Sequence, residues 1–130
     1  MADNFKKNVG NKGEIAAAEY LVSNDYQVVK VNYKTKYGEV DIICKNGDYI
    51  VFVEVKTRKK GTLASGVYSV NKKKKNNIFK VASFYISDNK IDKQPRFDII
   101  EVEHDVSDES YRVAEHYEDA FWQGGSYGIF

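Results

Sequence analysis

Two apolar stretches of the chain contain ionisable side chains that could take part in chemistry. Glu39 and Asp41 lie in the first stretch, and Glu54 and Lys56 lie in the second. Both stretches have the apolar content of buried strands, and burying a charge costs several kcal/mol unless another group compensates it. Carboxylates that converge in such a place repel each other, so we expect them to bind a cation. Hard oxygen ligands favour Mg²⁺ or Mn²⁺.

A metal held by Asp41 and Glu54 would suit phosphodiester hydrolysis. Such a metal can lower the pKa of a bound water and stabilise the charge that develops on a phosphate during in-line displacement. Lys56 comes two residues after Glu54 and would orient the attacking water or neutralise the phosphate oxygens. The alternative is an ion-pair cluster of Asp41 or Glu54 with Lys56 at a solvated strand end.

The elements that must position these residues follow the order αβββαβ. Apolar periodicity predicts helices at residues 11–24 and 71–87, capped by Asn11 and Asn71. Alternation and turn residues predict strands at residues 26–33, 39–45, 49–57 and 96–103, with a long loop at residues 58–70. Residues 115–122 are assigned to a short helix. This order indicates an α/β (α+β) fold with a mixed central sheet flanked by helices.

The hairpin between the two charged stretches places their side chains. Asn46-Gly47 predicts a two-residue turn, which puts Asp41 opposite Phe52 and Glu39 opposite Glu54. Asp41 and Glu54 are then diagonal neighbours, roughly 7–8 Å apart between Cα atoms, so their carboxylates can share one ion. Alternation places the four charged residues on one face with Ile43, Ile50 and Phe52. A helix must cover the opposite, apolar face, which comprises Val40, Ile42, Cys44, Val51, Val53 and Val55.

The charges are segregated along the sequence, although the net charge is only +1. Residues 55–87 contain nine basic and no acidic residues, whereas residues 98–130 contain nine acidic residues and one basic residue. This pattern favours a basic face that binds nucleic acid, and we expect DNA rather than RNA. The alternative is a solvated lysine run. The expected phosphate contacts are Arg58, Lys59, Lys60, Lys72, Lys73, Lys74 and Lys75.

Some polar residues have two interpretations. Lys74 falls one turn before the apolar side of its helix, so we expect its stem to pack inward with its amine near a phosphate. Arg58 contacts either a phosphate or Glu39, and Glu39 is itself a candidate accessory carboxylate. Glu14 is either an accessory ligand on the core-facing side of the first helix or the second half of a capping box with Asn11.

Other polar residues are expected to be structural. Arg96 and Asp98 share a face of their strand and should form a structural pair. His104 and His116 lie in the acidic region without the spacing of metal ligands, so we expect neither to be catalytic. Cys44 lies on the apolar face and is expected to fill the core.

Length and cysteine content limit the class of protein. A chain of 130 residues is long enough for one domain with its own core. We expect a single domain over residues 1–130, with its core at about residues 10–121 and a loose tail at residues 122–130. The single cysteine excludes an internal disulfide and favours a reducing compartment. The N-terminus lacks the apolar region of a signal peptide and the apolar runs are strand-sized, so we expect a cytoplasmic protein that does not engage a membrane.

The ordered series of motifs resembles a known group of proteins. Asp41 followed by Glu54-x-Lys56 across a hairpin, with Glu14 on the preceding helix, is similar to the PD-(D/E)xK nuclease superfamily, which includes restriction endonucleases and archaeal Holliday-junction resolvases. The chain resembles more closely the YraN family of predicted endonucleases. The similarity covers Gly10, Gly13, Glu14, residues 17–21, 38–43 and 51–58, Gly66, Val70, Lys74, residues 96–100, Ala120 and Phe121.

This resemblance implies a restriction-endonuclease-like αβββαβ core and a Mg²⁺-dependent endonuclease. It implies that Asp41 and Glu54 ligate the metal, that Lys56 is the catalytic lysine and that Glu14 is an accessory carboxylate. Val40 stands where the superfamily motif has the proline of its name.

The sequence therefore predicts a metal-dependent nuclease that hydrolyses phosphodiester bonds of nucleic acid, with structured or branched DNA as a candidate substrate. One alternative is a non-catalytic nucleic-acid-binding module on an endonuclease-like scaffold. Another is a structural protein whose acidic C-terminal region forms an interface. A homodimer would suit branched or double-stranded substrates, because these need paired cuts.

Overall fold

The computed structural model describes residues 12–62, 72–122 and 125–126, the last two by their backbone alone. Its elements in chain order are α2 (Lys12–Ser23), β1 (Gln27–Thr35), β2 (Gly38–Asn46), β3 (Tyr49–Lys59), α3 (Lys72–Asp88), β4 (Gln94–Asp105), β5 (Ser110–Trp122) and β6 (Gly125–Ser126). The predicted caps Asn11 and Asn71, and most of the predicted loop at residues 58–70, lie outside the described residues.

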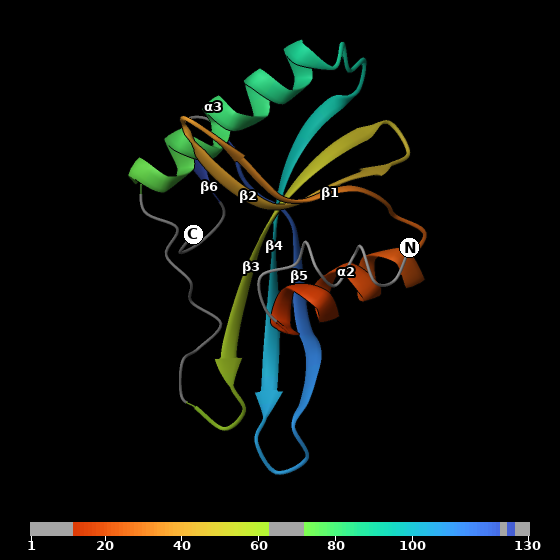
Figure 1. Cartoon of the computed structure of the whole chain (residues 1–130), viewed down its shortest axis with the longest axis vertical. Helices are drawn as coiled ribbons and strands as arrows, with labels where there is room; N and C mark the ends of the chain where they lie inside the picture. The colour runs from red at the N-terminus through yellow and green to blue at the C-terminus, as the bar shows by residue number, and fades with distance from the viewer. Residues whose placement is uncertain (1–11, 63–71, 123–124, 127–130) are drawn as a thin grey trace.

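The strands form one mixed sheet in the order β1-β2-β3-β4-β5-β6. β3 and β4 are parallel, and all other neighbouring pairs are antiparallel. Parallel neighbours need a crossover connection, and α3 lies between β3 and β4 in the chain (Figure 1). The predicted order αβββαβ and the mixed sheet with helices are confirmed, and β5 and β6 extend the sheet beyond β4.

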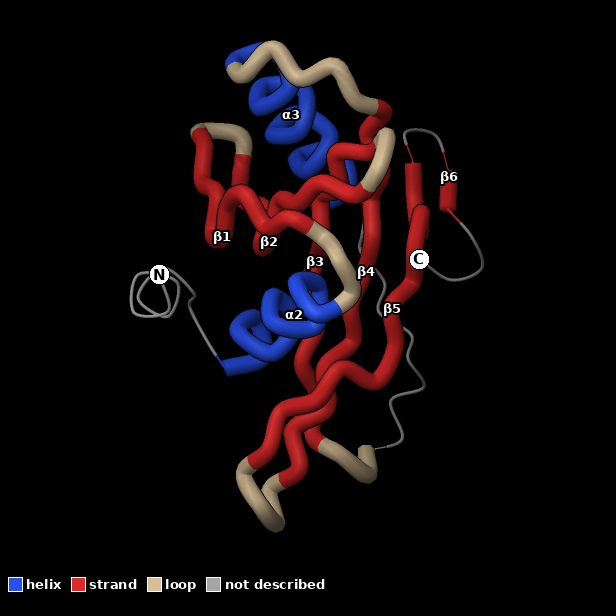
Figure 2. The backbone as a smooth tube through the Cα atoms, turned by 90° about the vertical axis from the view of Figure 1, so that its right-hand side faces the viewer, coloured by secondary structure: helices blue, strands red, loops and turns tan. Residues whose placement is uncertain are grey.

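Each helix packs on its own face of the sheet, because side chains alternate along the central strand β3. Ile50 and Phe52 belong to the core under α3, whereas Val51 and Val53 belong to the core under α2. Figure 2 shows α2 against the middle of the sheet and α3 toward one end of the molecule. Neither of the two described helices is both long and apolar enough to cross a lipid bilayer.

The hairpin between β2 and β3 has a different register from the predicted one. Its turn residues are Gly47 and Asp48, so Asn46 pairs with Tyr49. Gly47 has a φ angle of 57°, which a residue without a Cβ atom adopts easily at the first position of a tight turn. The predicted turn at Asn46-Gly47 was therefore wrong, and the observed pairing of β2 with β3 is shifted by two residues from the predicted one. A shift of two does not by itself move any side chain to the other face, because the strand period is also two.

The predicted apolar face under a helix is confirmed except at one end of β2. The residues that pack under α2 are Ile42, Cys44, Val51, Val53 and Val55. Val40 was expected among them, but it packs in the core under α3 instead. Val40 and Ile42 would share a face in a regular strand, so the alternation of β2 is interrupted between these two residues. In Figure 1, β1 and β2 cross β3 and β4 at a steep angle.

The predicted short helix at residues 115–122 is wrong, because these residues form the second half of β5. Two register shifts interrupt the pairing of β5 with β4. Each shift breaks the alternation of apolar and polar side chains by which a strand is recognised in a sequence. Phe121 nevertheless pairs with Phe97 and is fully buried. Within the predicted loose tail, Gly125–Ser126 pairs with β5 as β6.

Candidate active site

Asp41 lies at the point where β2 separates from β3. The ladder between the two strands ends at the pair Ile42 and Val53. Beyond that pair, the Oδ2 atom of Asp41 accepts a 2.8 Å hydrogen bond from the backbone N–H of Val55. A buried backbone N–H needs an acceptor when its ladder ends, and the carboxylate supplies one. This bond holds the Asp41 side chain against the charged end of β3.

Asp41 and Glu54 form an acidic pair at this position. Glu54 is only 5% exposed. Burial and then the negative charge of Glu54 raise the pKa of Asp41 from 3.8 to about 8, and the hydrogen bond from Val55 opposes this rise without cancelling it. The predicted convergence of the two carboxylates is therefore confirmed. Their mutual repulsion is a feature that a bound cation would relieve.

Two lysine side chains approach the same oxygen of Glu54. The Nζ atom of Lys74 lies 2.7 Å from Oε1 of Glu54, and the Nζ atom of Lys56 lies 3.7 Å from it. Burial lowers the pKa of Lys56, and the nearby Lys74 lowers it as well, although the charge of Glu54 opposes them. Burial also opposes protonation of Lys74, but the hydrogen bond and charge of Glu54 outweigh it and raise the pKa of Lys74. Lys74 is thus the main counterion of Glu54.

The contribution of Lys74 comes from a distant part of the sequence. Lys74 lies in the first turn of α3, and Glu54 lies on β3 on the other side of residues 63–71, which are outside the described chain. The expectation that its stem packs inward agrees with its partly buried position. Its partner, however, is a carboxylate of the acidic pair, which sequence reasoning did not find. The signal available in the sequence was its position one turn before the buried Ile78.

The two accessory carboxylates proposed from the sequence lie in different environments. Glu14, in the first turn of α2, is partly buried, and its charge contributes to the raised pKa of Asp41. Glu39 is exposed and pairs with Lys34 on β1. The prediction that Glu39 lies opposite Glu54 was wrong, because β2 has already left β3 at this point. Glu14 is therefore next to the acidic pair, whereas Glu39 lies on the part of β2 that has left β3.

Arg58 forms an ion pair with β4. Its Nε atom donates a 2.6 Å hydrogen bond to Oε1 of Glu101, and its Nη2 atom lies 3.6 Å from Oε2 of Glu103. Glu101 is 1% exposed, so the guanidinium neutralises a buried carboxylate. Sequence reasoning expected a phosphate or Glu39 as the partner of Arg58 and did not name Glu101 or Glu103. The parallel register of β3 and β4, which sequence analysis did not establish, brings these charges together.

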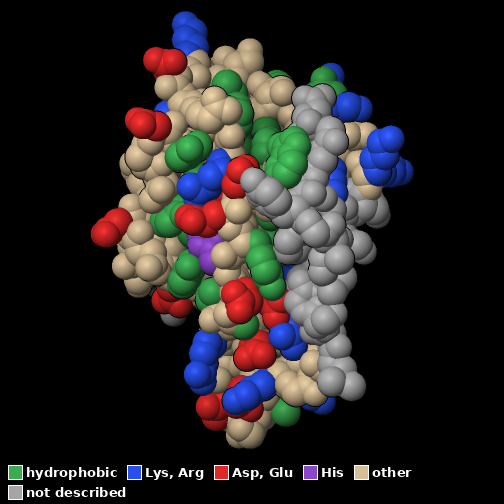
Figure 3. Space-filling view, turned by 180° about the vertical axis from the view of Figure 1, so that it is seen from behind, with side chains coloured by type: hydrophobic (Ala, Val, Ile, Leu, Met, Phe, Trp, Pro, Cys, Tyr) green, Lys and Arg blue, Asp and Glu red, His purple; other side chains and the backbone are tan. Residues whose placement is uncertain are grey.

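The other basic residues that were expected to contact phosphates lie in two groups. Lys59 and Lys60 are exposed at the end of β3, where Lys60 lies 3.4 Å from Asp105. Lys72 and Lys73 are exposed at the start of α3. Lys75 is partly buried, and its Nζ atom lies 5.8 Å from the centre of the Phe121 ring. On the face seen in Figure 3, basic and acidic side chains are interspersed, so the segregation in sequence is not preserved there.

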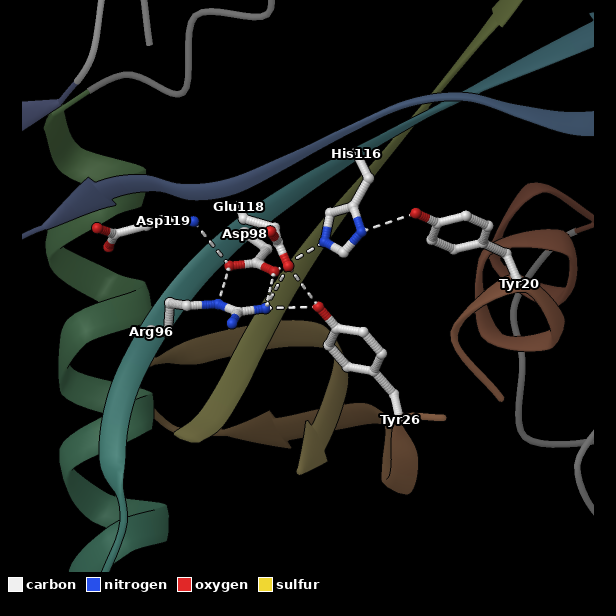
Figure 4. Close-up of polar contacts among 7 residues, drawn as sticks. All are labelled: Tyr20, Tyr26, Arg96, Asp98, His116, Glu118 and Asp119. Carbon is white, nitrogen blue, oxygen red and sulfur yellow. Dashed lines mark hydrogen bonds and ion pairs between the residues drawn. The ribbon is translucent and has the colours of Figure 1, made fainter. Parts of the chain in front are cut away.

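A second polar network lies under α2, where the predicted Arg96–Asp98 pair is confirmed. Arg96 donates to both oxygens of Asp98, at 2.9 and 2.8 Å. His116 lies 2.8 Å from Asp98 through Nε2 and 3.0 Å from the Tyr20 hydroxyl through Nδ1 (Figure 4). The network links α2 to β4 and β5, with Tyr26 bonded to Arg96 at 2.7 Å. Sequence analysis did not identify His116 or the tyrosines as members.

This network does not fit a metal site, although Asp98, His116 and Glu118 bring ligand atoms within 4.8 Å of one another. The guanidinium of Arg96 already supplies a cation to Asp98 and lies 3.4 Å from Glu118. A divalent ion there would meet a fixed positive charge. The charge of Asp98 is therefore already compensated within the chain.

The chain was also compared with known proteins. A family model described as "Uncharacterised protein family UPF0102" matches residues 13–102. A UPF0102 protein of Alkaliphilus oremlandii is 41% identical over 120 residues, which cover 90% of this chain and all of that relative. A UPF0102 protein of Clostridium acetobutylicum is 43% identical over 108 residues, covering 82% of this chain and 88% of that relative.

A third relative, a UPF0102 protein of Clostridioides difficile, is 44% identical over 97 residues, covering 74% of this chain and 85% of that relative. The family match runs from the residue before Glu14 into β4, so it includes both carboxylates of the acidic pair and both lysines. On this basis, the chain belongs to the UPF0102 family.

Proposed function

We propose that this protein is a metal-dependent nuclease that hydrolyses phosphodiester bonds of nucleic acid. The observation that carries the proposal is the pair of partly buried Asp41 and buried Glu54, with Lys56 beside it, at the place where β2 leaves β3. The similarity of these residues and of the αβββαβ order to the PD-(D/E)xK superfamily supports it. Structured or branched DNA is the proposed substrate, and a homodimer would provide paired cuts.

The donor set fits Mg²⁺ or Mn²⁺. Asp41 and Glu54 offer oxygen atoms only, and burial followed by the charge of Glu54 raises the pKa of Asp41 to about 8. A divalent cation would favour the ionised form of both groups, because it replaces repulsion with attraction. When bound, such a metal supplies an acidified water and stabilises negative charge on the phosphate.

The chain's own residues would have distinct roles. Asp41 and Glu54 would hold the metal, and the Val55 N–H would keep the Asp41 carboxylate in place. Lys56 lies 3.7 Å from Glu54 and would orient the attacking water or contact the phosphate oxygens. Glu14 would support the site from α2 through its charge.

The proposed grip on the nucleic acid comes from exposed lysines. Lys59 and Lys60 at the end of β3, and Lys72 and Lys73 at the start of α3, are available to phosphates, and such contacts are largely independent of base sequence. Arg58 is a weaker candidate than the sequence suggests, because its guanidinium is held by Glu101.

One observation favours a second candidate function, a nucleic-acid-binding module without turnover. Lys74 neutralises Glu54 within the chain, so the acidic pair is partly compensated without a metal. In that case the two carboxylates and two lysines would be a structural charge cluster, and the exposed lysines alone would bind the phosphate backbone.

Calorimetry with Mn²⁺, in the presence and absence of a short DNA duplex, separates these functions. The wild type should bind Mn²⁺, and Asp41→Asn should abolish the binding. Glu39→Gln is the matched control, because it removes an exposed carboxylate from the same strand outside the acidic pair. A plasmid-nicking assay with Mn²⁺ should follow the same pattern. Cleavage that survives Asp41→Asn would contradict the proposed site, and DNA binding without metal binding or cleavage would support the module.

A further inference from the structure

Among the described residues, the cationic group closest to Glu54 belongs to Lys74 of α3 and not to Lys56, the catalytic lysine expected on β3. The Nζ atom of Lys74 lies 2.7 Å from Oε1 of Glu54, an ångström closer than Lys56 at 3.7 Å. We propose that Lys74 is a built-in counterion that occupies the place of the divalent cation on Glu54 and must be displaced before the metal binds. This inference rests on the proposed function, because it concerns the same metal site.

The two partners differ in their freedom to move. The side chain of Glu54 is 6% exposed and belongs to the central strand of the sheet, whereas the side chain of Lys74 is 42% exposed. Lysine has a long flexible stem and strongly hydrated ammonium group, so it loses little by returning to water. Exchange therefore needs only the movement of Lys74, with β3 and α3 unchanged.

The exchange is competitive because both cations need the same carboxylate. An ammonium at 2.7 Å occupies a lone-pair direction of Oε1, and its positive charge opposes a second cation on either oxygen of Glu54. Lys74 carries one positive charge, and a divalent cation carries two, so the metal compensates Asp41 and Glu54 more completely once it is present. Before that, Lys74 keeps a buried carboxylate from being uncompensated.

The neighbouring lysines of α3 provide an internal comparison. Lys73 has the same charge and is one residue away, but it is exposed, and among the described residues the ion pairs of Glu54 are those with Lys56 and Lys74. Lys75 lies over the ring of Phe121. Removing Lys73 therefore changes the net charge at the start of α3 by the same amount as removing Lys74, while leaving the contact with Glu54 intact.

The test is the affinity of the full chain for Mn²⁺ without DNA, measured by calorimetry for the wild type, Lys74→Ala and Lys73→Ala at one ionic strength. Lys74→Ala should bind Mn²⁺ about tenfold more tightly than the wild type, because it removes the competitor. Lys73→Ala should change the affinity by less than about twofold, because its charge is exposed and screened. If Lys74→Ala folds poorly, Lys74→Gln serves the same purpose with a longer side chain.

A second measurement follows thermal unfolding. In EDTA, Lys74→Ala should melt at a lower temperature than Lys73→Ala, because Glu54 loses its closest cation. Saturating Mn²⁺ should bring the two variants to the same melting temperature. A general electrostatic effect would not produce this metal-dependent convergence.

The outcomes separate the inference from the function on which it rests. If the wild type binds Mn²⁺ and the two alanine variants bind it equally, Lys74 does not compete and the inference is overturned, while the metal site stands. If neither the wild type nor either variant binds Mn²⁺, the proposed metal site fails and the inference fails with it. Tighter binding by Lys74→Ala alone supports both.

Discussion

The substitution Asp41→Asn should stabilise the metal-free protein at alkaline pH and have little effect at acid pH. In the folded chain the pKa of Asp41 is raised from 3.8 to about 8, first by burial and then by the charge of Glu54. The folded state therefore holds this proton more tightly than the unfolded state does. Stability from the protonated carboxyl is fully present below pH 3.8 and is lost as the pH rises toward 8.

The magnitude follows from the size of the shift. The rise from 3.8 to about 8 is about four pKa units, and each unit is worth about 1.4 kcal/mol, so ionised Asp41 costs up to about 5 kcal/mol at pH 8. At pH 5 the cost is less than about 2 kcal/mol, because the folded carboxyl is still protonated there. Asparagine is uncharged, and its carbonyl oxygen can still accept the hydrogen bond from Val55.

Urea unfolding followed by circular dichroism in EDTA, at pH 5 and pH 8, measures this effect. The free energy of unfolding of Asp41→Asn should exceed that of the wild type at pH 8, and the gain should shrink at pH 5. Glu39→Gln, which removes an exposed carboxylate of the same strand, should change neither value by more than about 0.5 kcal/mol. Lower stability of Asp41→Asn at pH 8, or an equal gain at both pH values, would refute the reasoning.

Three other predictions concern the buried ion pairs of β3 and β4. Arg96→Ala should lower the free energy of unfolding by about 3–5 kcal/mol in urea at pH 7, because it leaves Asp98 buried without its cation; a loss below about 1 kcal/mol would contradict this. Burial raises the pKa of Asp98, but hydrogen bonds from its neighbours outweigh burial and hold this pKa below 3.8. The folded state therefore binds the proton of the Asp98 carboxyl less tightly than the unfolded state does. Stability should therefore fall as the pH drops below about 4, and urea titrations from pH 5 to pH 2 should show a flatter decline for Asp98→Asn. Arg58→Ala should destabilise the chain by about 2–4 kcal/mol, because it leaves the buried carboxylate of Glu101 without its cation. Lys59→Ala should leave stability unchanged and weaken DNA binding in a salt-dependent titration. The reverse pattern would show that Arg58 acts on the nucleic acid.

Local patterns in the sequence determined the elements and the faces of their residues. Apolar alternation and turn residues located β1 to β4, and 3.6-residue periodicity located α2 and α3. The two-residue error in the β2–β3 register changed no face, because the strand repeats every two residues. For the same reason Glu54 and Lys56 could be assigned to one side of β3 without knowledge of their neighbours. The assignment failed in β5, where two register shifts remove the repeat on which it depends.

The composition of the site was decided by contacts between elements. Asp41 meets Val55 because β2 leaves β3 after the pair Ile42 and Val53, and no residue near Asp41 signals that separation. Lys74 reaches Glu54 because α3 docks on the same face of the sheet.

The other ion pairs depend on strand order in the same way. Arg58 meets Glu101 because β3 and β4 are parallel neighbours, and His116 meets Asp98 because β5 returns beside β4. Periodicity reports which way a side chain points, since that depends on the backbone of a few residues. It does not report which charge lies opposite, since that depends on how helices and strands far apart in the chain pack together.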